Sequence, residues 1–309
     1  MDDTYWEEHE SHRDLHALLA TKVSNHPKTW AEASRRHDAA KWRQACDSEL
    51  ASLDATSTWD LVPNTEVPPG RRALPVRWAF TIKGDGRYKA RLVVLGCLQT
   101  KADYDDIFAP VIRLECLRVL LVLACLRGYE VDGMDVKTAF LNAALDVEIY
   151  IQQPPGFLKP GAERHVCLLK RSLYGLKQSP KLWYETFVKF MSTLGFSRLR
   201  KDRCVFVLQD SNHSIFVGLY VDDIVMIAPT MAHIAKLKGA FHERFQMTDL
   251  GPLSGILGWE IERNRSCGSM IIPQSKYTFE MVARFGNNAP HASTPIEPLS
   301  KAFQYPISN

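Results

Sequence analysis

Apolar and polar positions alternate in a way that divides the chain into short strands and amphipathic helices. Two hairpins show the strand pattern most clearly: residues 76–83 and 87–95 flank a Gly-Asp-Gly turn, and residues 215–221 and 224–228 flank an acidic pair. The other expected elements are helices over 38–54, 114–126 (buried), 180–194 and about 231–245, a Pro/Gly-rich connector over 62–72, a strand over 130–136, and extended segments over 149–157 and 165–173. Elements in this order predict an α+β fold with helices on one face of an antiparallel sheet.

The acidic pair in the second hairpin, Asp222 and Asp223, interrupts an otherwise apolar run. Two ionised carboxylates repel each other, and burying them among apolar side chains is costly without a compensating positive charge. The spacing places the pair in the two-residue turn between the strands. The ordinary alternative is a solvated hairpin tip that serves solubility, and the hairpin alone does not decide between these interpretations.

A further carboxylate has a matching context. Asp135 lies at the end of the expected strand over 130–136, whereas Asp132 falls on the opposite face of that strand. A strand-end aspartate and a hairpin pair are what a two-metal phosphoryl-transfer site needs, because hard oxygen ligands hold two Mg²⁺ ions about 3.5–4 Å apart. Such cations would also neutralise the repelling carboxylates.

Composition and charge narrow the class of protein. The chain has 309 residues, of which 46% are hydrophobic and 24% charged, as in a globular protein with two or three subdomains. Residues 1–60 have a net charge of −5 and residues 159–203 a net charge of +8. The basic segment suggests a bound polyanion, although a solvated basic face would give the same run.

Compartment signals favour an intracellular protein. The apolar runs fall short of transmembrane length, and the acidic N-terminus lacks the features of a signal peptide, so no membrane partner is expected. Seven scattered cysteines without a CxxC pair indicate reduced thiols and argue against a zinc site.

A series of motifs runs in order from about residue 28 to the end of the chain. They are W…LVP (59–63), YKARLVVLG (88–96), DYDDIFAPVIR (103–113), MDVKTAFLNAALDVEIYIQQPPGF (134–157), SLYGLKQSPKLWYE (172–185), LYVDDIVMIA (219–228), FQMTDLGPLSGILGWEI (245–261) and STPIEP (293–298). On these motifs the sequence resembles the reverse transcriptase of copia-type long-terminal-repeat retrotransposons, the RNA-dependent DNA polymerase region of the Pol polyprotein. The resemblance implies a right-hand polymerase-like fold of fingers and palm, with an antiparallel palm sheet backed by helices and a short thumb-like C-terminal tail.

The resemblance also implies domain limits. The expected parts are an N-terminal helical region (1–57), a reverse transcriptase domain (58–299) made of fingers (about 58–129), palm (about 130–250) and a connection or thumb-like start (about 251–299), and a tail (300–309).

Three aspartates match the family's catalytic positions. The resemblance implies that Asp135 and Asp222 bind two Mg²⁺ ions and that Asp223, their neighbour near the primer end, has less direct metal contact. The backbone carbonyl of Val136 would also be a ligand. Phe140 matches the aromatic residue whose ring blocks a ribose 2′-hydroxyl, and a core position is its alternative interpretation.

Two basic residues match the family's grip on the incoming nucleotide. Lys89 and Arg91 alternate along one strand and therefore point to one face, as residues that bind a triphosphate must. An exposed strand edge with ordinary charges is the alternative.

The segment SLYGLKQSP, residues 172–180, matches the family's template and nucleotide grip. Tyr174, Gly175, Lys177 and Gln178 are expected to contact substrate there, Gly175 through a close approach of its backbone. Which polar side chain touches the nucleotide stays open.

These observations lead to the hypothesis of an RNA-directed DNA polymerase that transfers a nucleotide from a dNTP to a primer 3′-hydroxyl with two Mg²⁺ ions. Its partners would be an RNA template, a DNA primer, their hybrid and a dNTP, in the cytoplasm or a virus-like particle. The alternatives are a catalytically inactive retroelement remnant that only binds nucleic acid and, less favoured, a palm-type nucleotide cyclase. Protease and integrase signatures are absent from the sequence, and little chain follows for an RNase H domain, so a segment of a polyprotein is expected.

Overall fold

The computed structural model describes residues 26–83, 85–209 and 213–285. The chain divides into two compact units, Met1–Pro252 and Leu253–Asn309. The start of the expected N-terminal helical region, the end of the expected connection and the tail over 300–309 lie outside the described residues.

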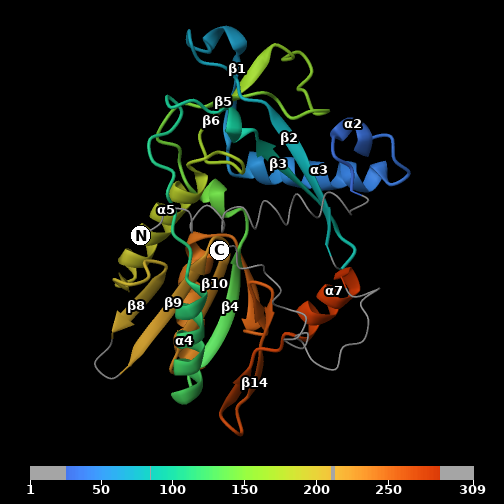
Figure 1. The fold of residues 1–309 in the computed structure, drawn as a ribbon. Coiled ribbons are helices and arrows are strands. Elements are labelled where there is room, and N and C mark those ends of the chain that lie inside the picture. The colour runs from blue at the N-terminus through green and yellow to red at the C-terminus, as the bar shows by residue number, and fades with distance from the viewer. Residues whose placement is uncertain (1–25, 84, 210–212, 286–309) are drawn as a thin grey trace, which may run out of the picture. The chain divides into compact units, whose positions relative to one another are not determined.

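Helices and antiparallel strands alternate through the first unit (Figure 1). Its elements are α2 (Trp30–Ala33), α3 (Ala39–Ala55), β1 (Trp59–Pro63), η1 (Asn64–Glu66), β2 (Val76–Ile82), β3 (Tyr88–Val94), η2 (Gly96–Leu98), α4 (Leu114–Leu126), β4 (Glu130–Val136), η3 (Ala139–Asn142), β5 (Tyr150–Ile151), β6 (His165–Leu169), α5 (Ser179–Thr193), β7 (Ser197–Arg198), β8 (Val205–Gln209), β9 (Ser214–Tyr220), β10 (Asp223–Ala228), α6 (Met231–Arg244) and β11 (Met247–Pro252). The expected helices are confirmed to within one residue at each end. The two extended segments are shorter than expected and become β5 and β6.

The hairpin of β2 and β3 packs against α3. The strands pair in register from Val76 opposite Val94 to Ile82 opposite Tyr88, as the alternating pattern predicts. Their inward side chains join one side of α3 in a core that includes Trp42, Trp78 and Leu92. β1, β6 and β5 form a separate three-stranded sheet, and its residues Ile151 and Leu169 belong to the same core.

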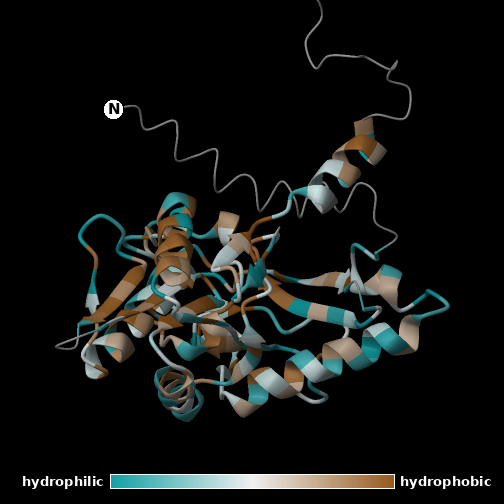
Figure 2. Cartoon of the chain, turned by 90° about the horizontal axis from the view of Figure 1, so that it is seen from below, coloured by the Kyte–Doolittle hydropathy of each residue, from teal (hydrophilic) through white to brown (hydrophobic). Residues whose placement is uncertain are grey.

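The largest sheet has six strands in the order β11-β4-β10-β9-β8-β7. Because directly opposed residues in antiparallel strands share a face, Asp135, Asp223 and Gly218 lie on one face, and Asp132, Met226 and Val217 on the other. The strands at the centre of the unit are predominantly hydrophobic (Figure 2). Residues 224–228 of β10 are all buried, so both faces of this strand are covered.

The expectation of helices on one face of this sheet is wrong. α4 lies in front of the sheet in Figure 1, and Ile112, just before it, contacts the Cα side of Gly218 on the same face as Asp135. α5 and α6 cover the opposite face, where Phe187 packs on Phe206 and Lys238 bonds Asp132. When nearly all residues of a strand are apolar, its sequence does not alternate between apolar and polar positions. The pattern then does not show whether helices cover one face of the sheet or both.

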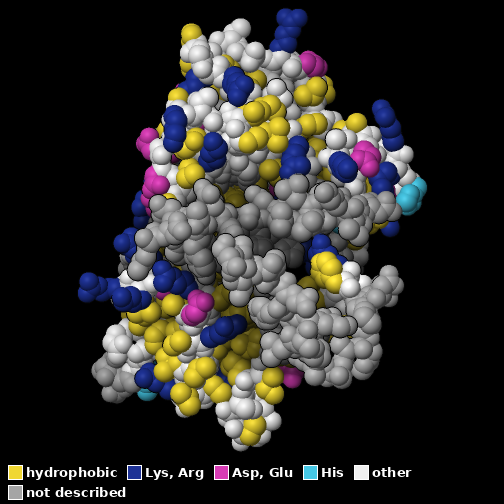
Figure 3. Space-filling model, in the orientation of Figure 1, with side chains coloured by type: hydrophobic (Ala, Val, Ile, Leu, Met, Phe, Trp, Pro, Cys, Tyr) yellow, Lys and Arg dark blue, Asp and Glu magenta, His cyan; other side chains and the backbone are white. Residues whose placement is uncertain are grey.

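α4 is not the fully buried helix that its composition predicts. Leu117, Leu121 and Ala124 are buried against the sheet, but Val119 and Leu126 on the other side are 66% and 81% exposed. Hydrophobic side chains accordingly gather over this part of the surface (Figure 3). An all-apolar run does not reveal which of its sides lacks a partner.

An aromatic core joins α5 and α6 to the sheet. Trp183 lies 5.3 Å from Phe245, and Phe187 lies 5.3 Å from Phe206 and 5.8 Å from Phe241 between ring centroids. These separations are in the range where edge-to-face aromatic pairs are favourable. The core fixes the position of α5, whose first two residues, Ser179 and Pro180, are the last two of the 172–180 segment.

The second unit contains two small antiparallel pairs and a helix. Its described elements are β12 (Gly255–Ile256), β13 (Trp259–Glu260), β14 (Glu262–Asn264), β15 (Ser269–Ile271) and α7 (Ser275–Phe285). Among the described helices of the chain, none combines the length and apolar character needed to cross a membrane.

Candidate active site

The three candidate aspartates come together at one end of the six-stranded sheet. Asp135 at the end of β4 is the direct cross-strand neighbour of Asp223 at the start of β10. Val136 donates its backbone N–H to the carbonyl oxygen of Asp222 at 2.9 Å, which ties the hairpin to the end of β4. The expected side-by-side arrangement is therefore present.

The turn between β9 and β10 differs from the expected one. Tyr220 pairs with Asp223, so the turn residues are Val221 and Asp222, and Asp223 already belongs to the strand. Val221 has φ of 56°, which is rare for a β-branched residue and strained. Trp183 of α5 donates its indole N–H to the carbonyl of Val221 at 2.6 Å and so helps to hold this conformation. Asp222 is therefore the last residue of the turn, immediately before β10.

Burial and electrostatic repulsion both act on the carboxylates at this sheet end. Burial, and next to it the charge of Asp222, raises the pKa of Asp135, while Lys89, Lys83 and Arg91 oppose this rise. Within the described residues, no three carboxylate, imidazole or thiol groups form a ready-made metal cage. The arrangement therefore offers adjacent carboxylates with basic residues nearby, and not a closed structural metal site.

Lys89 and Arg91 lie on the same side of β3, as the strand alternation predicts, and are half-buried. Burial, together with the charges of Arg91 and Lys83, lowers the pKa of Lys89, and the carboxylates of Glu49 and Asp135 act in the opposite direction. The hairpin of β2 and β3 thus brings positive charge within electrostatic reach of the aspartates from another part of the chain.

Tyr174 links this positive charge to Phe140. The Arg91 guanidinium lies 4.8 Å from the centroid of the Tyr174 ring, and the rings of Tyr174 and Phe140 meet edge to face at 4.9 Å. Burial raises the pKa of Tyr174 to about 12, so its hydroxyl stays protonated at neutral pH. Phe140 itself is half-buried on the short helix η3 and is not part of the fully buried core.

A glycine is required at position 175 because of packing within the protein, and not because of the expected close approach to substrate. Its φ is 91°, and a Cβ atom at this position would collide with the backbone carbonyl of Val94 in β3. The adjacent Tyr174 carbonyl accepts the Val94 N–H at 2.8 Å. The glycine therefore allows the 172–180 segment to dock on the edge of β3.

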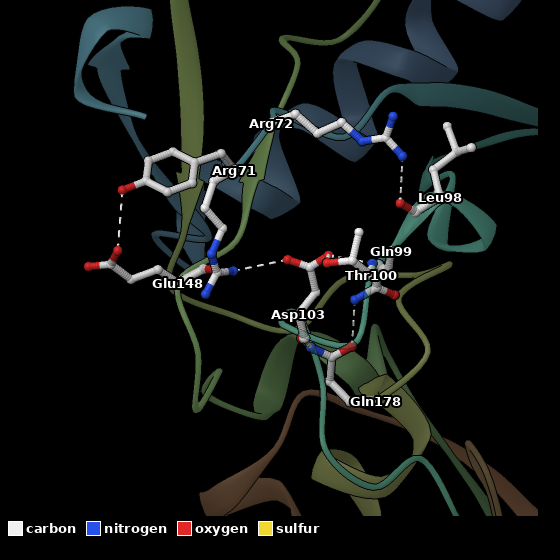
Figure 4. A network of polar contacts seen from close by, with 9 residues as sticks. Arg71, Arg72, Leu98, Gln99, Thr100, Asp103, Glu148 and Gln178 are labelled. Atoms are coloured by element: carbon white, nitrogen blue, oxygen red, sulfur yellow. Dashed lines mark hydrogen bonds and ion pairs between the residues drawn. The ribbon is translucent and has the colours of Figure 1, made fainter. Parts of the chain in front are cut away.

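Gln178 is buried in a polar network rather than directed toward the carboxylates (Figure 4). Its amide nitrogen donates to the carbonyl of Asp103 at 2.8 Å, and its amide oxygen accepts from Gln99 at 2.9 Å. The network extends through the Asp103 carboxylate to Arg71 at 2.9 Å. Both ends of the Gln178 amide are thus engaged within the protein.

Lys177 is attached to the same network. Its backbone N–H donates to Gln99 at 2.7 Å, and its ammonium donates to the Tyr104 hydroxyl at 3.1 Å. Gln99, Asp103 and Tyr104 were not among the expected site residues. Asp103 and Tyr104 belong to the DYDDIFAPVIR motif, whereas Gln99 lies outside the motifs, and the contacts join segments more than seventy residues apart.

Glu49 is a second residue that the sequence did not single out. It lies on the side of α3 that faces β3, is buried, and accepts the Leu92 N–H at 3.4 Å. Burial raises its pKa, and the nearby Arg91 and Lys89 oppose the rise. A buried carboxylate therefore anchors the strand that presents the two basic side chains.

Glu49→Gln is expected to stabilise the protein at neutral pH while preserving the bond to Leu92, because an amide oxygen also accepts it. A carboxyl whose folded pKa is raised contributes stability below its unfolded value of about 4.5, and this contribution is lost as the pH rises through the folded value. The melting temperature of the variant should therefore exceed that of the parent more at pH 7 than at pH 4. The exposed Asp54→Asn on the same helix should show no such pH-dependent gain, and an equal gain in both variants would contradict the assignment.

Comparisons with known proteins identify the family of the chain. The family model for reverse transcriptase (RNA-dependent DNA polymerase) matches residues 56–298. The retrovirus-related Pol polyprotein from transposon TNT 1-94 of Nicotiana tabacum is 41% identical over 278 residues, which cover 87% of this chain and 21% of that protein. The corresponding polyprotein from transposon RE2 of Arabidopsis thaliana is 36% identical over 85% of this chain and 18% of its own length. The transposon Ty1-DR1 Gag-Pol polyprotein of Saccharomyces cerevisiae is 27% identical over 96% of this chain and 17% of its own length.

The chain spans about a fifth of the length of these relatives. The family match covers most of the chain, including β4, the β9–β10 hairpin and the β2–β3 hairpin. The resemblance seen in the sequence motifs is confirmed: the chain belongs to the reverse transcriptase (RNA-dependent DNA polymerase) family, in the form found in Pol polyproteins of copia-type retrotransposons.

Proposed function

We propose that this chain is the polymerising part of an RNA-directed DNA polymerase. The six-stranded sheet would be its palm, the β2–β3 hairpin its fingers and the second unit the start of a thumb-like connection. The observation that supports this best is the convergence of Asp135, Asp222 and Asp223 at one sheet end, with Lys89 and Arg91 within electrostatic reach.

The aspartates fit a pair of Mg²⁺ ions because a cation would stabilise the ionised form of Asp135, whose pKa is raised by burial and next by the charge of Asp222. Asp135 and Asp222 would hold the ions, with the Val136 carbonyl as a further ligand and Asp223 beside them. Mg²⁺ is commonly bound by one or two carboxylates plus substrate phosphates, so a closed protein cage is not required. The ions would supply charge that activates the primer 3′-hydroxyl and stabilises the departing pyrophosphate.

The protein's own side chains would bind and orient the nucleotide. Lys89 and Arg91 would bind the triphosphate, since guanidinium and ammonium groups form strong charge-assisted bonds to phosphate. The Tyr174 ring contacts both the Arg91 guanidinium and the Phe140 ring. Phe140 would then exclude a ribose 2′-hydroxyl by its bulk, which orients and selects deoxynucleotides.

Extension of a DNA primer on an RNA template tests this proposal. The purified chain should extend the primer with dNTPs in Mg²⁺ and should stop when EDTA is added. If the chain binds the hybrid but leaves the primer unextended, the inactive-remnant hypothesis is supported instead. Production of a cyclic nucleotide from a nucleoside triphosphate would support the cyclase alternative.

Phe140→Ala is expected to admit ribonucleotides while leaving deoxynucleotide incorporation largely intact. Removing the ring removes a steric block without removing a metal or phosphate ligand, so the preference for dNTP over rNTP should fall by at least about tenfold. The ratio of kcat/KM for the two substrates measures this change. Leu141→Ala next to it removes a buried side chain and should lower stability without altering the ratio. An unfolded Phe140→Ala would show that this ring is a core residue.

A further inference from the structure

A groove is lined by residues from the C-terminal halves of α5 and α6, which contact each other through the rings of Phe190 and Phe241. Its larger part has a volume of about 710 Å³, and a second part of about 270 Å³ adjoins it. The two parts share Asn142, Glu243 and Arg244 in their walls, so they form one continuous depression. We call it the α5–α6 groove.

Positive charge dominates the walls of this groove. The cationic or titratable basic residues that line it are Arg171, Lys189, Arg244, Lys137 and His242, against the single carboxylate of Glu243. None of these six side chains forms an ion pair within the described part of the chain. The groove thus collects positive charge from α5, α6 and the segments that follow β4 and β6.

Helix electrostatics alone do not account for this charge. His242 and Arg244 lie in the last turn of α6, where cations stabilise the helix dipole. The other three basic residues are not in the last turn of α6: Lys189 lies in the C-terminal half of α5, Arg171 follows β6 and Lys137 follows β4. Four separate segments therefore bring basic residues to one depression, which a single capped helix end does not explain.

The groove lies apart from the candidate catalytic carboxylates. α5 and α6 cover the sheet face opposite Asp135, as the contacts of Phe187 with Phe206 and of Lys238 with Asp132 establish. Near η3 the two sites approach each other, because Asn142 lines the groove while Phe140 contacts Tyr174. A nucleic acid longer than the active site requires could therefore reach both.

We propose that the α5–α6 groove binds the phosphodiester backbone of a nucleic-acid strand, as a second site beyond the active site. The proposal rests on the proposed polymerase function, which supplies the polyanion. An open groove with cations spread along its length suits a linear chain of phosphates better than a compact ligand. Contacts of this kind are independent of base sequence and release counterions, so binding weakens with salt.

The test compares two double variants that remove equal charge from exposed positions. Lys189→Gln/Arg244→Gln removes two cations from the groove, and Arg200→Gln/Lys201→Gln removes two from the exposed segment between α5 and β8. Binding of a fluorescent long RNA–DNA hybrid is measured over a salt series, together with single-nucleotide addition to a short hybrid.

The groove variant should bind the long hybrid about tenfold more weakly at low salt, and its slope of log affinity against log salt should fall by about 2. The control variant should stay within about twofold of the parent. Short-hybrid addition should be unchanged in both, because neither pair belongs to the active site. Equal losses in the two variants, or no loss in the groove variant, would overturn the groove site alone. A parent chain that binds no hybrid would overturn both this site and the proposed function.

Discussion

Asp222→Asn is expected to abolish primer extension while leaving hybrid binding and folding intact. The asparagine preserves the Val136 N–H bond to residue 222, because that bond uses the backbone carbonyl. It removes one charge from the pair that would hold the cations, and the lost stabilisation of several kcal/mol corresponds to a fall in rate of about a thousandfold or more. Single-turnover extension in Mg²⁺ measures the loss, and fluorescence anisotropy with the same hybrid measures retained binding.

Stability gives an independent readout of the same substitution. Because Asp222 helps to raise the pKa of Asp135, the metal-free parent loses stability as the pH rises through that raised value. Asp222→Asn removes part of the cause, so in EDTA its melting temperature should hold or rise relative to the parent at pH 7. Asp146→Asn, at an exposed position, serves as the matched control and should change neither activity nor stability. A lower melting temperature with lost binding would make Asp222 a structural residue, and full activity would refute the site.

Lys238→Met, on α6, is expected to produce a large loss of stability. The Lys238 ammonium lies 2.6 Å from the carboxylates of both Asp132 and Asp249, and the Asp132 side chain is only 2% exposed. Burial disfavours the charged lysine, but bonds to the two aspartates outweigh it and raise the Lys238 pKa. Removing the cation leaves a buried carboxylate uncompensated, which costs about 3–5 kcal/mol.

Urea unfolding at pH 7 measures this loss, with the exposed Lys236→Met on the same helix as the control. Adding Asp132→Asn to Lys238→Met should restore part of the stability, since the buried charge is then gone. The bond from Lys238 lowers the pKa of Asp249 in the folded protein. The stabilisation that Asp249 contributes is therefore fully present above its ordinary pKa of 3.8, and it is lost as the pH falls through the lowered pKa of the folded state. A loss no larger than in Lys236→Met would show that the ion triad is energetically neutral.

The local elements of this protein follow from the sequence because each depends on neighbouring residues alone. The 3.6-residue spacing located α3, α5 and α6, and the alternation around a Gly-Asp-Gly turn located β2 and β3. The same alternation predicted that Asp135 and Asp132 lie on opposite faces of the strand. In the structure Asp132 accordingly forms an ion pair with Lys238 of α6, and Asp135 lies beside Asp223 at the candidate site. The order of the motifs was sufficient to identify the family.

Pairing between distant segments decided what local periodicity could not. The turn contains Val221 and Asp222 because the register of β9 with β10 places Tyr220 opposite Asp223, and the indole of Trp183 holds the strained residue. The exposed side of α4 depends on which side of the helix packs on the sheet, and an all-apolar run has no pattern that reports it.

Side-chain roles needed the tertiary structure for the same reason. Gln178 has donors and acceptors that suit a nucleotide, but Gln99 and Asp103, distant in sequence, occupy them. Glu49 resembles any helix glutamate in sequence, and only the docking of α3 on β3 buries it beside Leu92. The sequence by itself determined which residue types and local elements exist, whereas the long-range contacts of the folded chain determined which of these side chains remain available to bind a ligand.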